Sequence, residues 1–287
     1  MSDPRADSVR ARLLQHARQR GEDYNLLLTR YALERWLYRL SVSDQRDSFV
    51  LKGALLFSLW FDQPHRPTRD ADFLGFGVAD ADLLRERLQA ICRVACDDGM
   101  RFDADSVHVA PIREQARYDG FRANLLGWLG TARCSVQLDV GFGDAVTPAA
   151  QEMDYPTLLA DTPAPRLRVY PRETVLAEKL EAMIVLGMRN SRMKDYFDVW
   201  VLLSQAAFDP VVLAQAIHAT CLRRETALPE DWPTGLDDEF ASDVAKLAQW
   251  QAFLRKNRLE APALAELIAE LRTALTQPLD TARGLSR

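Results

Sequence analysis

Two aspartates separated by one residue, Asp70 and Asp72, are the side chains whose spacing most directly suggests chemistry. They close the stretch RPTRDADF, in which every second position is polar: Arg66, Thr68, Asp70 and Asp72. In a β-strand these side chains share one face, and the two aspartates lie about 7 Å apart at their backbones. Carboxylates held this close resist ionising together unless a cation lies between them. The spacing therefore favours an Mg²⁺ site, with a polar turn as the alternative.

A third carboxylate, Asp139, interrupts an otherwise apolar strand pattern in CSVQLDVGFGD. Alternate positions there are apolar: Cys134, Val136, Leu138 and Val140. A charged residue in the middle of a strand is disfavoured, and it is costly if it is buried without a partner. Asp139 either faces water or completes a cluster of three carboxylates with Asp70 and Asp72.

A lysine in the second half of the chain could supply a matching cation. In ETVLAEKLEAMIVLG, a helical projection places Lys179 at the edge of the apolar stripe, whereas Glu178 and Glu181 fall on the far side. Its ammonium group either extends to water or reaches a phosphate.

The next helical segment, MKDYFDVWVLL, carries two further carboxylates. Asp195 and Asp198 share the side opposite the apolar residues of this helix. Asp198 could pair with Lys194 on the same helix, or it could face a cleft between the two halves of the chain.

The patterning predicts the elements that must position these residues. Helices are expected over 6–20, 23–41, 49–61 and 80–98, and strands over 68–77, 106–115, 121–130 and 132–144. The segment 146–173 contains five prolines and little periodicity, so a domain boundary is placed near residue 165. Beyond it the pattern is almost entirely helical. The fold class is α+β over residues 1–165, followed by a mostly helical domain over 166–287.

Composition limits the function classes. The net charge of −5 argues against a general nucleic-acid coat protein. Residues 1–50 nevertheless hold nine arginines against seven acidic residues, and MRNSRMK is also basic, so a local positive surface for RNA is possible. No apolar run approaches the roughly 20 residues that span a bilayer, and no signal peptide is recognised, which predicts a cytoplasmic protein without a membrane partner.

Four motifs together resemble the AbiEii family of nucleotidyltransferases, the toxins of type IV toxin–antitoxin systems. KGALLFSLW followed by RPTRDADF is similar to the first family motif, Lys-Gly-Gly, an apolar run and Arg-x-Ser/Thr-x-Asp-x-Asp. QLDVGFGD resembles the next strand, YPRETVLAEKLEAMI the Pro-x-Glu-x-x-x-Ala-Glu-Lys-Leu helix, and RMKDYFDVWVL the Lys-Asp-x-x-Asp-Leu helix. The motifs occur in family order over residues 50–203. Ala54 departs from the pattern, because the family has Gly or Ser there.

The resemblance implies a polymerase-β-like nucleotidyltransferase core, a mixed sheet with helices, and a helical C-terminal domain. It implies that Asp70 and Asp72 hold Mg²⁺ and the nucleotide triphosphate and that Asp198 is essential, while Asp139 is the third metal-ligand candidate from the strand pattern. The implied nucleotide-binding residues are Lys52, Gly53, Ala54, Arg66, Thr68 and Lys179. The implied activity is transfer of a nucleotide from a nucleoside triphosphate (NTP) to the 3′ acceptor end of tRNA, which blocks translation, with a cognate antitoxin as a possible partner.

Three other functions fit the same residues. A nucleotidyltransferase of the antibiotic-modifying type would use the same carboxylates on a small-molecule acceptor. A metal-dependent nuclease also needs clustered carboxylates. A catalytically silent binding protein is the third, although the presence of Asp70, Asp72, Asp139 and Lys179 argues against it.

Overall fold

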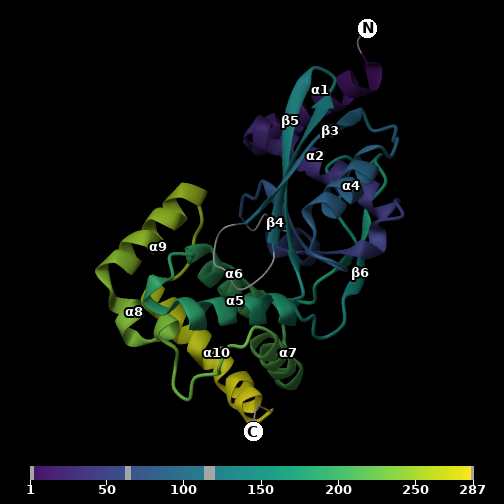
Figure 1. Ribbon diagram of the computed structural model, residues 1–287. Helices are drawn as coiled ribbons and strands as arrows, with labels where there is room; N and C mark the ends of the chain where they lie inside the picture. Colours follow the sequence, from purple (N-terminus) through teal and green to yellow (C-terminus); the bar gives the residue numbers. More distant parts are fainter. Residues whose placement is uncertain (1–2, 62–65, 113–119, 286–287) are drawn as a thin grey trace. The chain divides into compact units, whose positions relative to one another are not determined.

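The computed structural model describes residues 3–61, 66–112 and 120–285 (Figure 1). The chain divides into two units. The first comprises residues 1–143 and 151–169, and the second comprises residues 144–150 and 170–287. None of the helices in the described ranges has the length and hydropathy of a membrane-spanning segment.

The helices of the first unit begin and end at residues suited to those positions. They are α1 (Pro4–Arg20), α2 (Tyr24–Ser41), the short α3 (Phe57–Trp60) and α4 (Ala81–Cys92). Asp3 caps α1 by accepting hydrogen bonds from the amides of Arg5 and Ala6, and Pro4 stands at the first helical position. Gly21 ends α1 with a φ of 65°, a left-handed conformation that costs glycine little.

Seven strands form one mixed sheet in the order β3-β4-β5-β2-β1-β7-β6. Their bounds are β1 Phe49–Lys52, β2 Asp70–Gly75, β3 Met100–Pro111, β4 Gly120–Leu129, β5 Ala132–Phe142, β6 Gln151–Asp154 and β7 Arg166–Val169. Strand β2 pairs in parallel with β5 and antiparallel with β1. The mixed sheet with helices confirms the predicted α+β fold class. Residues 113–115 of the strand expected over 106–115 lie outside the described residues.

One face of the central strands packs on α2. The indole of Trp36 meets the ring of Phe73 edge-on, with centroids 5.8 Å apart, and Phe49 meets Phe73 in the same way at 5.9 Å. Ala71 and Phe73 are 0% and 1% exposed, whereas Asp70 and Asp72 are half-buried. Strand alternation therefore sends the two aspartates to the face opposite α2.

The helix predicted over 49–61 is wrong in its first four residues. Phe49–Lys52 form β1, and helical structure starts only at Gly53, in a 3₁₀ turn (Gly53–Leu56) that continues into α3. Strand β1 pairs with β2 and, in parallel, with β7, which follows more than 110 residues later. Non-local pairing of this kind outweighs the local preference of a continuous apolar run.

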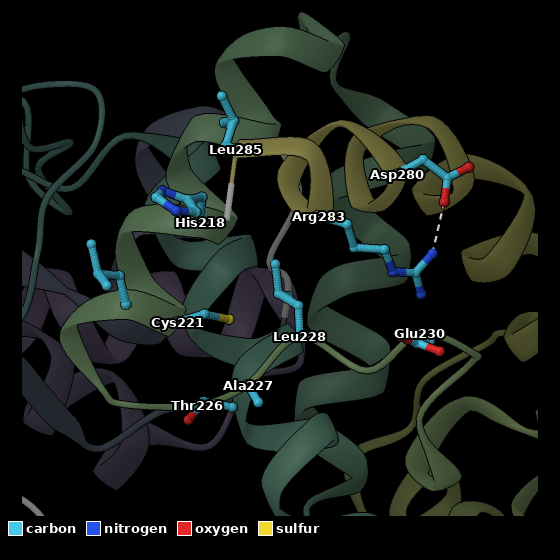
Figure 2. A pocket seen from close by; sticks show the side chains of 10 residues that line it. His218, Cys221, Thr226, Ala227, Leu228, Glu230, Asp280, Arg283 and Leu285 are labelled. Atoms are coloured by element: carbon cyan, nitrogen blue, oxygen red, sulfur yellow. Dashed lines mark hydrogen bonds and ion pairs between the residues drawn. The ribbon is translucent and has the colours of Figure 1, made fainter. Parts of the chain in front are cut away.

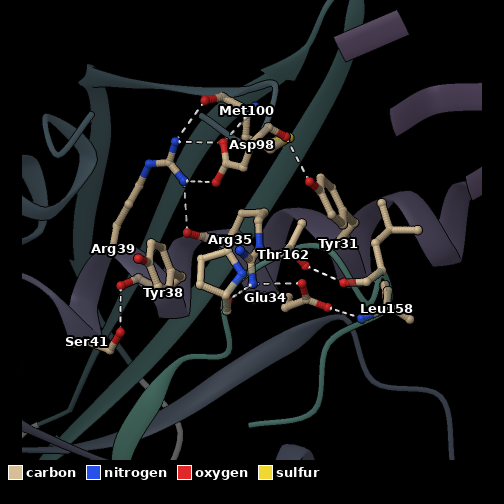
Figure 3. Close-up of polar contacts among 12 residues, drawn as sticks. Tyr31, Glu34, Arg35, Tyr38, Arg39, Ser41, Asp98, Met100, Leu158 and Thr162 are labelled. Atoms are coloured by element: carbon tan, nitrogen blue, oxygen red, sulfur yellow. Dashed lines mark hydrogen bonds and ion pairs between the residues drawn. The ribbon is translucent and has the colours of Figure 1, made fainter. Parts of the chain in front are cut away.

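A buried polar network fixes α2 to the start of β3 (Figure 3). The guanidinium of Arg39 donates to both carboxylate oxygens of Asp98, at 2.6 and 3.1 Å, and to the carbonyl of Met100. The hydroxyl of Tyr31 donates to the carbonyl of Asp98 at 2.8 Å. Arg39 and Asp98 are each 2% exposed, so each supplies the counter-charge that the other needs in the interior.

The second unit is helical. Its helices are α5 (Arg172–Leu186), α6 (Met193–Gln205), α7 (Pro210–Arg223), α8 (Asp238–Ser242), α9 (Val244–Asn257) and α10 (Leu264–Leu285). Helix α7 contacts α5 and α10, and α6 contacts α5, α9 and α10. Figure 1 shows α10 in yellow running beside α7.

Candidate active site

Asp70 and Asp72 lie on β2 two residues apart, as the alternation predicts. Strand β2 begins at Asp70, so Arg66 and Thr68 precede it rather than belonging to it. The hydroxyl of Thr68 donates a hydrogen bond to Oδ1 of Asp70 at 2.6 Å. This bond fixes one oxygen of the first carboxylate.

The sheet places two more predicted site residues on either side of Asp72. Asp139 on β5 is its register partner in the parallel pair, and Lys52 on β1 is its partner in the antiparallel pair. Neighbouring strands lie about 4.8 Å apart. Asp139, Asp72 and Lys52 therefore form a row across three strands, and Asp70 is opposite Gln137.

Arg122 on β4 binds Asp139, which the sequence interpretation did not anticipate. Its Nε and terminal nitrogen donate to the two carboxylate oxygens at 2.8 and 2.7 Å. Such a two-pronged pair is strong and directional. Arg122 is 47% exposed at its side chain and Asp139 only 16%, so the pair lies at the edge of the solvent.

The carboxylates provide the oxygen ligands that Mg²⁺ prefers. Asp70 and Asp72 fit this role by their shared strand face. Among the described residues, no group of three or more acidic, histidine or cysteine side chains is arranged to hold a metal, and Asp139 is already held by Arg122. The three-aspartate ligand set stays a prediction.

Gly53 approaches Asp72 so closely that no larger residue fits. Its φ is 76°, which strains any residue with a Cβ. A Cβ added there would meet the carboxylate of Asp72, closer than real Cβ atoms come to their neighbours. The backbone of the 3₁₀ turn and the second aspartate of β2 are thus in direct contact, with Lys52 and Ala54 flanking the glycine.

A second cluster of charges lies in the helical unit, around Lys179 on α5. Its Nζ is 2.7 Å from Oδ1 of Asp195 and 2.7 Å from Oδ2 of Asp198, both on α6. The two aspartate side chains are 1% and 0% exposed, and Lys179 is 13% exposed. Arg192 also contacts Asp195 at 2.8 Å.

This cluster decides between the partners considered for Asp198. Asp195 and Asp198 are both buried, and pairing with Lys179 permits that burial. Asp198 pairs with Lys179 of another helix rather than with Lys194, which is exposed. The cleft predicted between Lys179 and the aspartates of β2 stays a prediction.

The sequence interpretation missed a third group, centred on Arg224. Its guanidinium contacts Asp144 at 3.0 Å, Glu178 at 3.3 Å and Glu181 at 2.9 Å. Burial alone would lower the pKa of Arg224, but these carboxylates raise the pKa above its ordinary value. Glu178 and Glu181 thus serve as structural partners of an arginine rather than as a solvated face.

One pocket, of about 800 Å³, lies within the helical unit and shares no lining residue with the carboxylates of β2 and β5 (Figure 2). Its Arg283 is paired with Asp280 at 2.7 Å. Burial, and then Glu181, raise the pKa of the Cys221 thiol to about 12, so this thiol is not ionised at neutral pH.

Comparison with known proteins gives one family. A family model described as nucleotidyl transferase AbiEii toxin, type IV TA system, matches residues 35–277. Curated proteins gave no match. The crystal structure of JHP933 from Helicobacter pylori is 15% identical, with a TM-score of 0.49, covering 89% of this chain and 92% of that one. A second H. pylori structure, whose description proposes a nucleotidyltransferase, is 15% identical with a TM-score of 0.47, covering 89% of this chain and 96% of that one. The family match includes all three charged clusters.

Proposed function

Because the chain belongs to the AbiEii nucleotidyltransferase toxin family of type IV toxin–antitoxin systems, we propose that it transfers a nucleotide from an NTP to the 3′ end of tRNA. The observation that supports this most is the row of Asp139, Asp72 and Lys52 across neighbouring strands, with Gly53 against Asp72. In the reaction a 3′ hydroxyl attacks the α-phosphorus, an O–P bond forms, and pyrophosphate leaves. Family membership also implies a cognate antitoxin.

In this proposal Asp70 and Asp72 would hold Mg²⁺, and Asp139, which pairs with the half-exposed Arg122, would be the third ligand. The metal would supply neutralisation of the phosphate charge. Thr68 keeps Asp70 oriented through its hydroxyl group. The carboxylates thus position the reacting phosphate, which is the main requirement of phosphoryl chemistry.

The nucleotide-binding residues take the roles that their positions favour. Gly53 lets the backbone approach the phosphates. The other residues proposed to bind the nucleotide there are Lys52, Ala54, Arg66 and Thr68. Lys179 provides a positive charge for the triphosphate, and Asp195 and Asp198 fix its ammonium group. Asp198 is then essential because it positions Lys179.

We predict that Gly53→Ala lowers the transfer rate at least about 100-fold, because a Cβ there displaces the Asp72 carboxylate, and a displacement of about 1 Å can cost that much. The matched control is Ala54→Ser, which introduces a residue of the family pattern at the neighbouring position. It should transfer at close to the parent rate. Both rates come from the incorporation of labelled nucleotide into RNA. Equal rates for the two variants would show that the turn does not set the position of Asp72.

The test of the proposed function is incubation of the protein with total RNA and each labelled NTP in turn, with and without Mg²⁺. We expect label at the 3′ end of tRNA with one or two of the NTPs, and no label with Asp72→Asn. RNA that shortens without any NTP would indicate a nuclease. RNA that stays unlabelled while a small acceptor is modified would favour the antibiotic-modifying alternative.

A separate experiment tests whether the basic segment around Arg189 binds RNA. Arg189 is exposed. Arg192 is unsuitable for this test because it contacts the buried Asp195. Phosphate contacts weaken steeply with salt. If tRNA binds with about four such contacts, log affinity should fall with log salt at a slope near −3, and Arg189→Glu should make it shallower. If the affinity for tRNA does not change with salt concentration, RNA is not the acceptor and that part of the proposal is wrong.

A further inference from the structure

A second pocket, of about 300 Å³, opens in the first unit and shares no residue with the carboxylate row. Helices α1 and α2, the end of α3 and the segment 155–158 after β6 form its walls. Its volume is at the lower end of the range for small-ligand sites. The size suits one small molecule or a single unit of a polymer.

The rim of this pocket is positively charged. Arg20 on α1 and Arg30 on α2 both face Glu22, at 4.0 and 3.2 Å. Two guanidinium groups therefore share one carboxylate, which leaves a net positive charge on the rim. Arg20 is 58% exposed at its side chain, and His16 lies one helical turn before it. This rim is suited to a phosphate group.

The interior combines aromatic rings with hydrogen-bonding groups. Phe61 and Tyr155 line the pocket. Burial raises the pKa of the Tyr155 phenol to about 12, against the lowering influence of Arg30 and of a hydrogen bond with Ser58. Tyr155 therefore stays neutral. Bases of single-stranded RNA stack on such rings, and polar groups beside the rings read their edges.

Glu34 is the deepest polar group of the pocket. It is 2% exposed, and its Oε2 accepts a hydrogen bond from the amide of Leu158 at 2.6 Å (Figure 3). Its Oε1 lies 2.9 Å from the guanidinium of Arg35. Burial raises the pKa of Glu34 to about 7, although Arg35, Leu158 and Arg30 lower it. The amide of Leu158 and the guanidinium of Arg35 thus hold this carboxyl group in place at the wall of the pocket.

We propose that this pocket binds one nucleotide of a single-stranded RNA, with the phosphate on the Arg20 and Arg30 rim and the base against Phe61 and Tyr155. The inference rests on the proposed function and extends it by assigning a second RNA contact that shares no lining residue with the carboxylate row. Its test measures binding alone, so it can fail while nucleotide transfer is observed, and the reverse.

The experiment uses the full chain carrying Asp72→Asn, without NTP, and a fluorescein-labelled ten-nucleotide single-stranded RNA followed by anisotropy. Arg20→Gln should weaken binding about 5- to 10-fold and make the slope of log affinity against log salt shallower by about 0.7, the loss of one phosphate contact. Arg18→Gln is the matched control, since Arg18 is exposed on α1 outside the pocket lining. It should change affinity less than twofold.

A second variant tests the pocket itself rather than its charge. Thr157→Trp fills the space and should weaken single-stranded RNA binding at least about 5-fold, the loss of one stacked base, while leaving the melting temperature and the binding of a double-stranded DNA of equal charge unchanged. A nucleoside monophosphate should compete with the RNA in the parent but not in Thr157→Trp. The proposal is overturned if Arg20→Gln and Arg18→Gln behave alike, or if Thr157→Trp binds RNA as the parent does.

Discussion

Asp72→Asn is expected to lower the rate of nucleotide transfer at least about 1,000-fold, since losing one strong electrostatic contact to the reacting group costs that much. Asp72 is the central member of the row that includes Asp139 and Lys52, and Gly53 packs on it. The asparagine keeps the shape of the side chain and removes its charge. The melting temperature should therefore stay within about 2 °C of the parent value, because the variant leaves the packing of Phe73 and Ala71 untouched.

The control for this prediction is Asp105→Asn, which removes an exposed carboxylate from the same unit. It should transfer at the parent rate. Initial rates of labelled-NTP incorporation at saturating Mg²⁺ provide the comparison. If Asp72→Asn keeps more than a tenth of the parent rate, Asp72 is not a metal ligand in the reaction.

Lys179→Met is expected to destabilise the helical unit by about 3–5 kcal/mol, the usual cost of removing one partner from a buried ion pair. Two fully buried aspartates, Asp195 and Asp198, would lose the ammonium group that both contact, and Arg192 contacts only Asp195 of the two. For a unit of this size the melting temperature should fall by about 10 °C.

Two further variants separate charge from packing at this site. Lys194→Met removes an exposed lysine of the same helical region and should leave the melting temperature within about 1 °C. Adding Asp195→Asn and Asp198→Asn to Lys179→Met removes the uncompensated charges and should restore much of the stability, without restoring transfer. Melting is followed by circular dichroism. A Lys179→Met protein that melts like Lys194→Met would contradict the buried pairing.

Local pattern was sufficient for the parts of the site that lie on regular elements. Alternation predicted β2 and β5, and with them the faces of Asp70, Asp72 and Asp139. The pair of Arg122 and Asp139 could also have been found. The hairpin between β4 and β5 turns at Gly130 and Thr131, and that turn sets the register that places the two residues opposite each other.

Other features depend on contacts that no local pattern carries. Strand β1 forms because β2 and the distant β7 pair with it, so its apolar sequence was taken for the start of a helix. Asp195 and Asp198 are buried because a lysine on another helix reaches them. Arg224 meets Asp144 across 80 residues of sequence. Each of these depends on tertiary structure overriding local preference.

The central claim is that the row of Asp72, Asp139 and Lys52 serves transfer of a nucleotide to an RNA 3′ end. It is tested most directly by the intact mass of a purified tRNA after incubation with Mg²⁺ and each NTP. The account predicts a gain of one or more whole nucleotide residues with the parent protein, matched by released pyrophosphate, and no gain with Asp72→Asn. An unchanged mass with every NTP, or the same gain with Asp72→Asn, would contradict it.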